Sequence, residues 1–158
     1  MITSIHLPAK VVMLATMIAL VGLLAQTAAF ASTGTAVVVG DGTIEPGLPE
    51  DPLADPTPQT VTFGGTAVVA TDTAQGTTEC DFSGETDESV LSGSGTVTGT
   101  CTGPISAGCS IDYSRTAAVI TLDGTCGGDV AGPVVGSCQF AVTSFNSYAV
   151  VCELVVGV

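Results

Sequence analysis

The chain has 158 residues, of which 46% are hydrophobic, 11% are charged and 4% are aromatic, and this length suits one modest domain. Asp and Glu number 15 against 2 Lys and Arg, so the formal net charge is -13. Because each contact with a phosphate needs a cation, this balance argues against nucleic acids and anionic membrane surfaces as partners.

Residues 1–31 are predicted to be a signal peptide. Lys10 provides a cationic start, residues 11–25 form an apolar run, and small residues stand at Ala29 and Ala31. The alternative is an uncleaved membrane anchor, since the apolar run approaches the roughly 20 residues that span a bilayer. The small residues favour cleavage after Ala31. We therefore expect a secreted, extracellular protein with no membrane attachment after cleavage.

Residues 32–59 are predicted to be an acidic, Pro-rich linker or arm. A short apolar run at 35–39 is followed by a stretch with five carboxylates and five prolines. Proline restricts its own backbone and biases the preceding residue toward extended conformations. We expect this segment to have no packed core of its own.

Residues 60–158 are predicted to form an all-β domain. Short runs rich in Val, Thr, Ile and Phe alternate with Gly, Ser and Asp, and no helical apolar stripe persists over several turns. We expect a small antiparallel β-sandwich or a closed β-barrel of about seven to eight strands, stabilised by disulfides. The candidate strands are 60–71, 77–83, 95–102, 108–114, 116–123, 133–142 and 147–157.

The last two candidate strands give the clearest register. A five-residue hairpin loop over 143–147 places Cys138 directly opposite Cys152.

Six cysteines downstream of an export signal predict three disulfides. They are Cys80, Cys101, Cys109, Cys126, Cys138 and Cys152. Beyond the pairing of Cys138 with Cys152, hairpin geometry favours Cys80 with Cys101 and Cys109 with Cys126. The alternative joins Cys101 to Cys109 and Cys80 to Cys126. No C-x-x-C is present, which argues against thioredoxin-type redox chemistry and zinc ribbons.

The mature chain lacks most catalytic side chains. Cleavage removes His6 and Lys10, the sole His and the sole Lys, and with them the commonest general base and the amine nucleophile. An even cysteine count leaves no spare thiol, so carboxylates remain. Most carboxylates of the β domain stand beside Gly, Ser or Thr, where we expect them to solubilise the surface. The full set of carboxylates in this domain is Asp72, Glu79, Asp81, Glu85, Asp87, Glu88, Asp112, Asp123, Asp129 and Glu153.

Two acidic clusters suit calcium in ligand type, since calcium prefers carboxylate and backbone oxygen. One cluster contains Asp41, Glu45, Glu50, Asp51 and Asp55, and the other contains Asp81, Glu85, Asp87 and Glu88. Neither has the order of a calcium-binding loop. We therefore expect at most weak, diffuse Ca²⁺ binding, with no catalytic, cofactor or defined metal-ligand residues.

Arg115 is the one basic residue after the predicted cleavage site, and it stands close to Asp112. We expect a surface ion pair across a turn, a type of contact that contributes about 0–1 kcal/mol.

The loss of the usual catalytic groups favours a non-enzymatic extracellular domain that binds, or gives structure to, a partner of unknown identity outside the cell. One alternative is a carboxylate-dependent hydrolase resembling a glycosidase, which needs two converging acids. A second is a small protease inhibitor that presents a disulfide-held loop such as 102–108.

Overall fold

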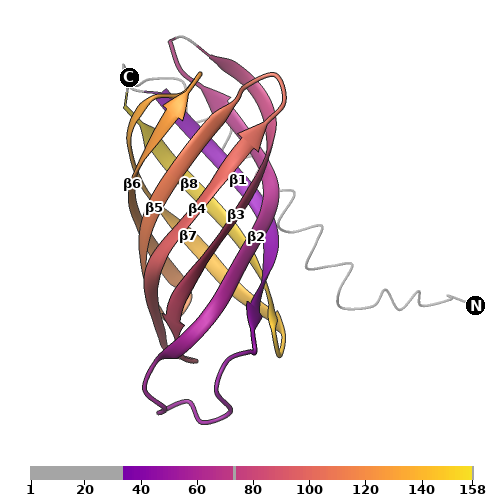
Figure 1. Cartoon of the computed structure of the whole chain (residues 1–158), viewed down its shortest axis with the longest axis vertical. Coiled ribbons are helices and arrows are strands. Elements are labelled where there is room, and N and C mark those ends of the chain that lie inside the picture. Colours follow the sequence, from indigo (N-terminus) through magenta and orange to yellow (C-terminus); the bar gives the residue numbers. More distant parts are fainter. Residues whose placement is uncertain (1–33, 73, 158) are drawn as a thin grey trace, which may run out of the picture. The chain divides into compact units, whose positions relative to one another are not determined.

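The computed structural model describes residues 34–72 and 74–157, and these form a closed antiparallel barrel of eight strands (Figure 1). In chain order the strands are β1 (Gly34–Glu45), β2 (Thr57–Ala70), β3 (Gln75–Glu88), β4 (Ser92–Thr102), β5 (Ala107–Thr116), β6 (Val119–Gly128), β7 (Gly132–Ser144) and β8 (Ser147–Val156). Each strand pairs with the next, and β1 pairs with β8 to close the circle. The all-β prediction is confirmed, and the barrel is the architecture adopted.

All seven predicted strands are present, and most extend beyond their predicted bounds. The largest extension is in β3, which was expected over 77–83 and continues to Glu88. The last five residues of β3, Gly84 to Glu88, contain no apolar side chain, so hydrophobic periodicity does not identify them as part of a strand. Alternation nevertheless persists there, because Thr86 and Glu88 are buried while Glu85 and Asp87 are exposed.

The structure corrects the predicted arm over 32–59. Its apolar run belongs to β1, in which Ala36, Val38 and Ile44 are buried at alternate positions. These side chains complete the inner wall of the barrel between β2 and β8. Among the described residues of the predicted arm, the connection 46–56, seen as the long purple loop at the bottom of Figure 1, is the part that lies outside the strands.

The chain runs up and down, so its connections alternate between two ends of the barrel. We call one the Arg115 end, where connections 46–56, 89–91, 117–118 and 145–146 lie. We call the other the Ile105 end, where connections 71–74, 103–106 and 129–131 lie.

Three hairpins each carry one disulfide between directly opposed residues. Cys80 pairs with Cys101 across β3 and β4, and the other two bonds join β5 to β6 and β7 to β8. The pairs are Cys80–Cys101, Cys109–Cys126 and Cys138–Cys152, as hairpin geometry predicts, and no described cysteine is free. Cys138 lies opposite Cys152 in the register expected from the last hairpin. Three disulfides are consistent with an extracellular protein.

The predicted signal peptide lies outside the described residues. Within residues 34–72 and 74–157, no helix is long and apolar enough to cross a membrane.

Candidate ligand-binding cavity

The inner face of the barrel borders a cavity of about 160 Å³. Its middle is bordered by apolar side chains from six strands: Phe63, Phe82, Val97, Ile111, Leu122 and Leu154. Most of these inward-facing side chains are only partly buried. Residues that fill a solid core lose nearly all their accessible surface, so partial burial of inward residues indicates that they border a hollow.

Glycines on the inner face explain why the aromatic rings leave the centre open. A Cβ at Gly40 or Gly65 would lie 2.7 or 2.6 Å from the ring of Phe63. The ring therefore lies against wall positions that carry no side chain. Phe63 also packs on Phe82, with ring centroids 6.4 Å apart. The aromatic side chains thus form part of the wall, and the space between them stays unfilled.

The three disulfides also face the interior and contribute to the cavity wall. This follows from their register, because two cysteines directly opposite each other on neighbouring strands point to the same side of the sheet. The bonds tie the wall together within each hairpin. Their sulfur atoms carry no charge and no strong hydrogen-bonding group, so they leave the cavity surface apolar.

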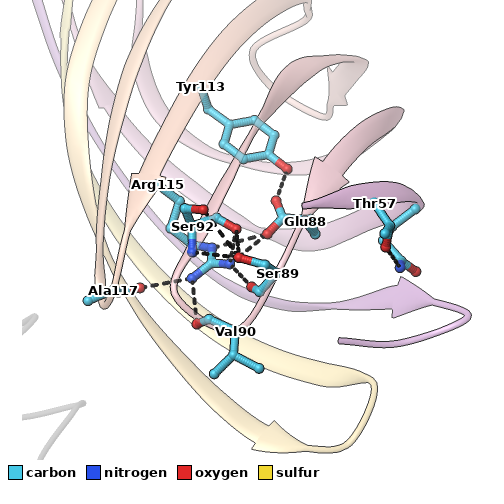
Figure 2. Close-up of polar contacts among 9 residues, drawn as sticks. Thr57, Glu88, Ser89, Val90, Ser92, Tyr113, Arg115 and Ala117 are labelled. Carbon is cyan, nitrogen blue, oxygen red and sulfur yellow. Dashed lines mark hydrogen bonds and ion pairs between the residues drawn. The ribbon is translucent and has the colours of Figure 1, made fainter. Parts of the chain in front are cut away.

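At the Arg115 end, the cavity meets a buried polar cluster (Figure 2). The Arg115 guanidinium donates through Nη2 and Nε to Glu88 Oε2, at 2.7 and 3.2 Å, and both residues are 2% exposed. The other carboxylate oxygen of Glu88 accepts a hydrogen bond from the Tyr113 hydroxyl. Arg115 also lies over Phe140, with Cζ 4.8 Å from the ring centroid. Every charged atom of this cluster therefore has a partner.

Arg115 further binds the connections at its end of the barrel. Nη1 donates to the carbonyl oxygens of Ala117 and Val90, at 3.0 and 3.4 Å. Nη2 donates to the carbonyl oxygens of Ser92, at 2.9 Å, and Ser89. One side chain thus holds the β3–β4 connection and the β5–β6 turn to the barrel wall, as Figure 2 shows.

The structure corrects the prediction of a surface ion pair between Arg115 and Asp112. Side chains alternate between the two faces of β5, and Arg115 lies on the same face as Ile111 and Tyr113, which points into the barrel. Asp112 lies on the opposite face and is exposed. Glu88 was likewise expected to solubilise the surface, yet it is buried. The alternation along β5 was a signal in the sequence that could have placed Arg115 inside.

Burial raises the pKa of the Tyr113 phenol, and the hydrogen bond to the Glu88 carboxylate raises it further. The pKa of Tyr148 is also raised, again chiefly by burial, and its hydroxyl donates to the Thr62 carbonyl oxygen at 2.6 Å. Both phenols are therefore neutral donors with their protons already engaged.

At the Ile105 end, the cavity is covered by two apolar side chains from connections. Ile105 in 103–106 and Val130 in 129–131 are buried and border the cavity. The Thr78 hydroxyl donates to the Ile105 carbonyl oxygen at 2.7 Å. This cover contains no charged side chain that faces the cavity.

The remaining predicted site residues do not converge. Asp81, Glu85 and Asp87 are exposed on the outer face of β3, while Glu88 points into the barrel. Asp51 accepts a hydrogen bond from the Leu53 backbone N–H within the 46–56 connection, at 2.9 Å. Among the described residues, no group of three or more His, Cys, Asp or Glu side chains is placed to hold a metal ion.

This geometry gives an apolar compartment that is bordered at one end by a fully hydrogen-bonded ion pair and at the other by two buried aliphatic side chains. It can enclose a small apolar molecule, and the sequence pattern gave no sign of it because the wall comes from all eight strands. Comparison of the chain with known proteins finds no matching family model, no matching curated protein and no matching solved structure.

Proposed function

We propose that this protein is a secreted, non-enzymatic binding domain that holds one compact apolar molecule inside its barrel. The observation that carries the proposal is the cavity of about 160 Å³ bordered by aliphatic, aromatic and disulfide groups. Apolar cavities of about 150 Å³ in proteins remain dry and bind benzene. Eight-stranded barrels have an interior that side chains either fill or leave open for one small ligand.

The cavity favours an uncharged hydrocarbon as ligand, because the polar side chains that border it already form hydrogen bonds within the protein and offer none to a ligand. Glu88 is paired with Arg115 and Tyr113, and Tyr148 donates to a backbone carbonyl. A hydroxyl or amine on the ligand would lose its hydrogen bonds to water and gain none in return. We expect benzene and toluene to bind more tightly than phenol.

Two observations favour binding over the alternative functions. Among the described residues, Glu88 is the one carboxylate that borders the cavity, and its oxygens are engaged, which does not favour a pair of catalytic acids. The loop 102–108 of the inhibitor alternative is largely exposed, but its central side chain, Ile105, is 3% exposed and borders the cavity, so this side chain is not presented to a protease. Secretion is supported by the three disulfides and by the predicted leader.

Titration of the purified protein with fluorobenzene, followed by ¹⁹F NMR, tests the proposal. We expect one site with a Kd on the order of 1 mM or tighter. Val97→Phe places a ring into the cavity and should abolish binding, because Val97 borders it.

Val68→Phe is the matched control, since Val68 is 50% exposed on the outer face of β2. This variant should bind fluorobenzene as the parent does. Failure of the parent to bind fluorobenzene, benzene or toluene would contradict the proposal, as would equal loss of binding in both variants.

A further inference from the structure

We infer that the ligand enters and leaves through the Ile105 end, where Ile105 and Val130 form a lid over the cavity. This inference rests on the proposed function and specifies how the same site is reached. Buried side chains border the cavity at both ends of the barrel, Ile105 and Val130 at one and Glu88 and Arg115 at the other, so exchange has to displace one of these sets. The two ends differ in the contacts that would have to break.

The Arg115 end is held by a dense set of charge-assisted contacts. Opening it would separate Arg115 from Glu88 and from four backbone carbonyls. Charge-assisted hydrogen bonds are roughly twice as strong as neutral ones, and a buried charge without a partner is strongly unfavourable. The 46–56 connection adds the buried Leu48 and a hydrogen bond of 3.1 Å from Gly47 N–H to Gln59 Oε1. The Arg115 end is therefore expected to stay in place during ligand exchange.

The Ile105 end is held by fewer contacts, and these lie mainly between connections. The backbone N–H of Ser106 donates to Asp129 Oδ2, and the N–H of Asp129 donates to the Ser106 carbonyl oxygen, each at 2.8 Å. Ser106 and Asp129 are exposed, so water competes for these bonds. A buried hydrogen bond from the Thr78 hydroxyl to the Ile105 carbonyl oxygen also holds this cover to the barrel wall.

Opening this end therefore exposes two aliphatic side chains and breaks neutral or solvent-exposed hydrogen bonds. No buried ion pair is disrupted. Local opening events with few buried contacts require the smallest free energy, so exchange should proceed through the Ile105 end.

Measurement of fluorobenzene exchange by ¹⁹F NMR separates the two ends. Asp129→Ala removes the acceptor for the Ser106 N–H and leaves the cavity wall intact. It should raise the exchange rate about fivefold to tenfold, as expected for loss of one charge-assisted hydrogen bond. Easier opening accelerates association and dissociation by the same factor, so the Kd of Asp129→Ala for fluorobenzene should stay within about twofold of the parental Kd.

Asp51→Ala is the matched control at the Arg115 end, since Asp51 also accepts from a backbone N–H in an exposed connection. It should leave the exchange rate within about twofold of the parent. A second pair, Ile105→Ala and Leu48→Ala, compares equal truncations of buried aliphatic side chains at the two ends. The first should accelerate exchange and the second should not.

The inference is overturned if Asp51→Ala or Leu48→Ala accelerates exchange, or if Asp129→Ala and Ile105→Ala both exchange at the parental rate. Absence of fluorobenzene binding to the parent protein is a different outcome, because it overturns the proposed function itself and the inference with it.

Discussion

At the scale of single residues, the buried pair of Glu88 and Arg115 is the strongest electrostatic feature of the barrel. Both are 2% exposed, and their charges are compensated by each other and by neighbouring donors and acceptors. The carboxylate occupies the space that a Cβ at Gly93 would need, so the glycine leaves room for it. Removal of one member leaves a buried charge without its partner, which is more unfavourable than removal of both.

Arg115→Met should therefore lower the free energy of unfolding by about 3–5 kcal/mol. The double variant Glu88→Leu with Arg115→Met should be more stable than Arg115→Met alone, because no isolated charge remains. Urea denaturation at neutral pH measures both effects. Asp112→Asn, on the exposed face of the same strand, is the control and should change stability by less than about 1 kcal/mol. A loss of less than 1 kcal/mol in Arg115→Met would show that the pair is dispensable for stability.

At the scale of strands and hairpins, the disulfides cross-link three of the four successive hairpins and leave the first one without a covalent link. Hairpins β3–β4, β5–β6 and β7–β8 are each cross-linked, with the two cysteines separated by 14 to 21 positions in the sequence. The β1–β2 hairpin carries no disulfide, and its connection 46–56 is the longest among the described residues. Each cross-link stabilises the fold by about 2–4 kcal/mol, chiefly by restricting the unfolded chain. Strand β1 therefore depends on its hydrogen bonds and its packed side chains alone.

We expect backbone amides of β1, and of β2 where it faces β1, to exchange with deuterium at least about tenfold faster than those of β5 and β6. The reason is that β1 can separate from β2 and β8 without disturbing any cross-linked hairpin. Hydrogen exchange with mass spectrometry under native conditions measures this difference. Uniform exchange across the strands, or fastest exchange in β5 and β6, would contradict this account of the barrel.

At the scale of the whole molecule, closure of the barrel brings the first and last strands together. Gly34 lies opposite Val156 in the register of β1 and β8, at the Ile105 end. The barrel therefore has no free sheet edge within the described residues, which removes the usual site for edge-to-edge association. Each strand also neighbours in space the strands that precede and follow it in the chain, and β8 is followed in space by β1.

A circular permutant tests this arrangement. A variant with a short Gly-Ser linker from Val156 to Gly34, and with new ends between Ala54 and Asp55 in the more exposed second half of the 46–56 connection, should fold with three disulfides. Its unfolding free energy should fall by no more than about 2 kcal/mol. Circular dichroism, disulfide mapping and thermal denaturation measure the result. New ends inside β3, between Phe82 and Ser83, interrupt two strand pairings and should prevent folding. Failure of the first permutant would argue against the β1–β8 closure.

The sequence alone determined the features that depend on neighbouring residues. Period-two alternation identified seven strands, and the short last hairpin set the register that places Cys138 against Cys152. Hairpin geometry favoured the three disulfide pairs that form, but it left open the alternative that joins Cys101 to Cys109. The register of β4 and β5 excludes that alternative, because it places Cys101 opposite Ala107. The strand ending at Glu88 was cut short because its inward positions are polar, and hydrophobic periodicity cannot recognise them.

Tertiary structure decided what depends on distant residues. The placement of 34–45 as a barrel strand required its pairing with β8, more than 100 residues further along the chain. Arg115 and Glu88 are 27 residues apart and meet because β3 and β5 both point these positions into the barrel. The cavity exists because eight inner faces close around a space that their side chains leave unfilled. No local pattern contains that information, since the volume of a hollow is a property of the closed wall rather than of any one strand.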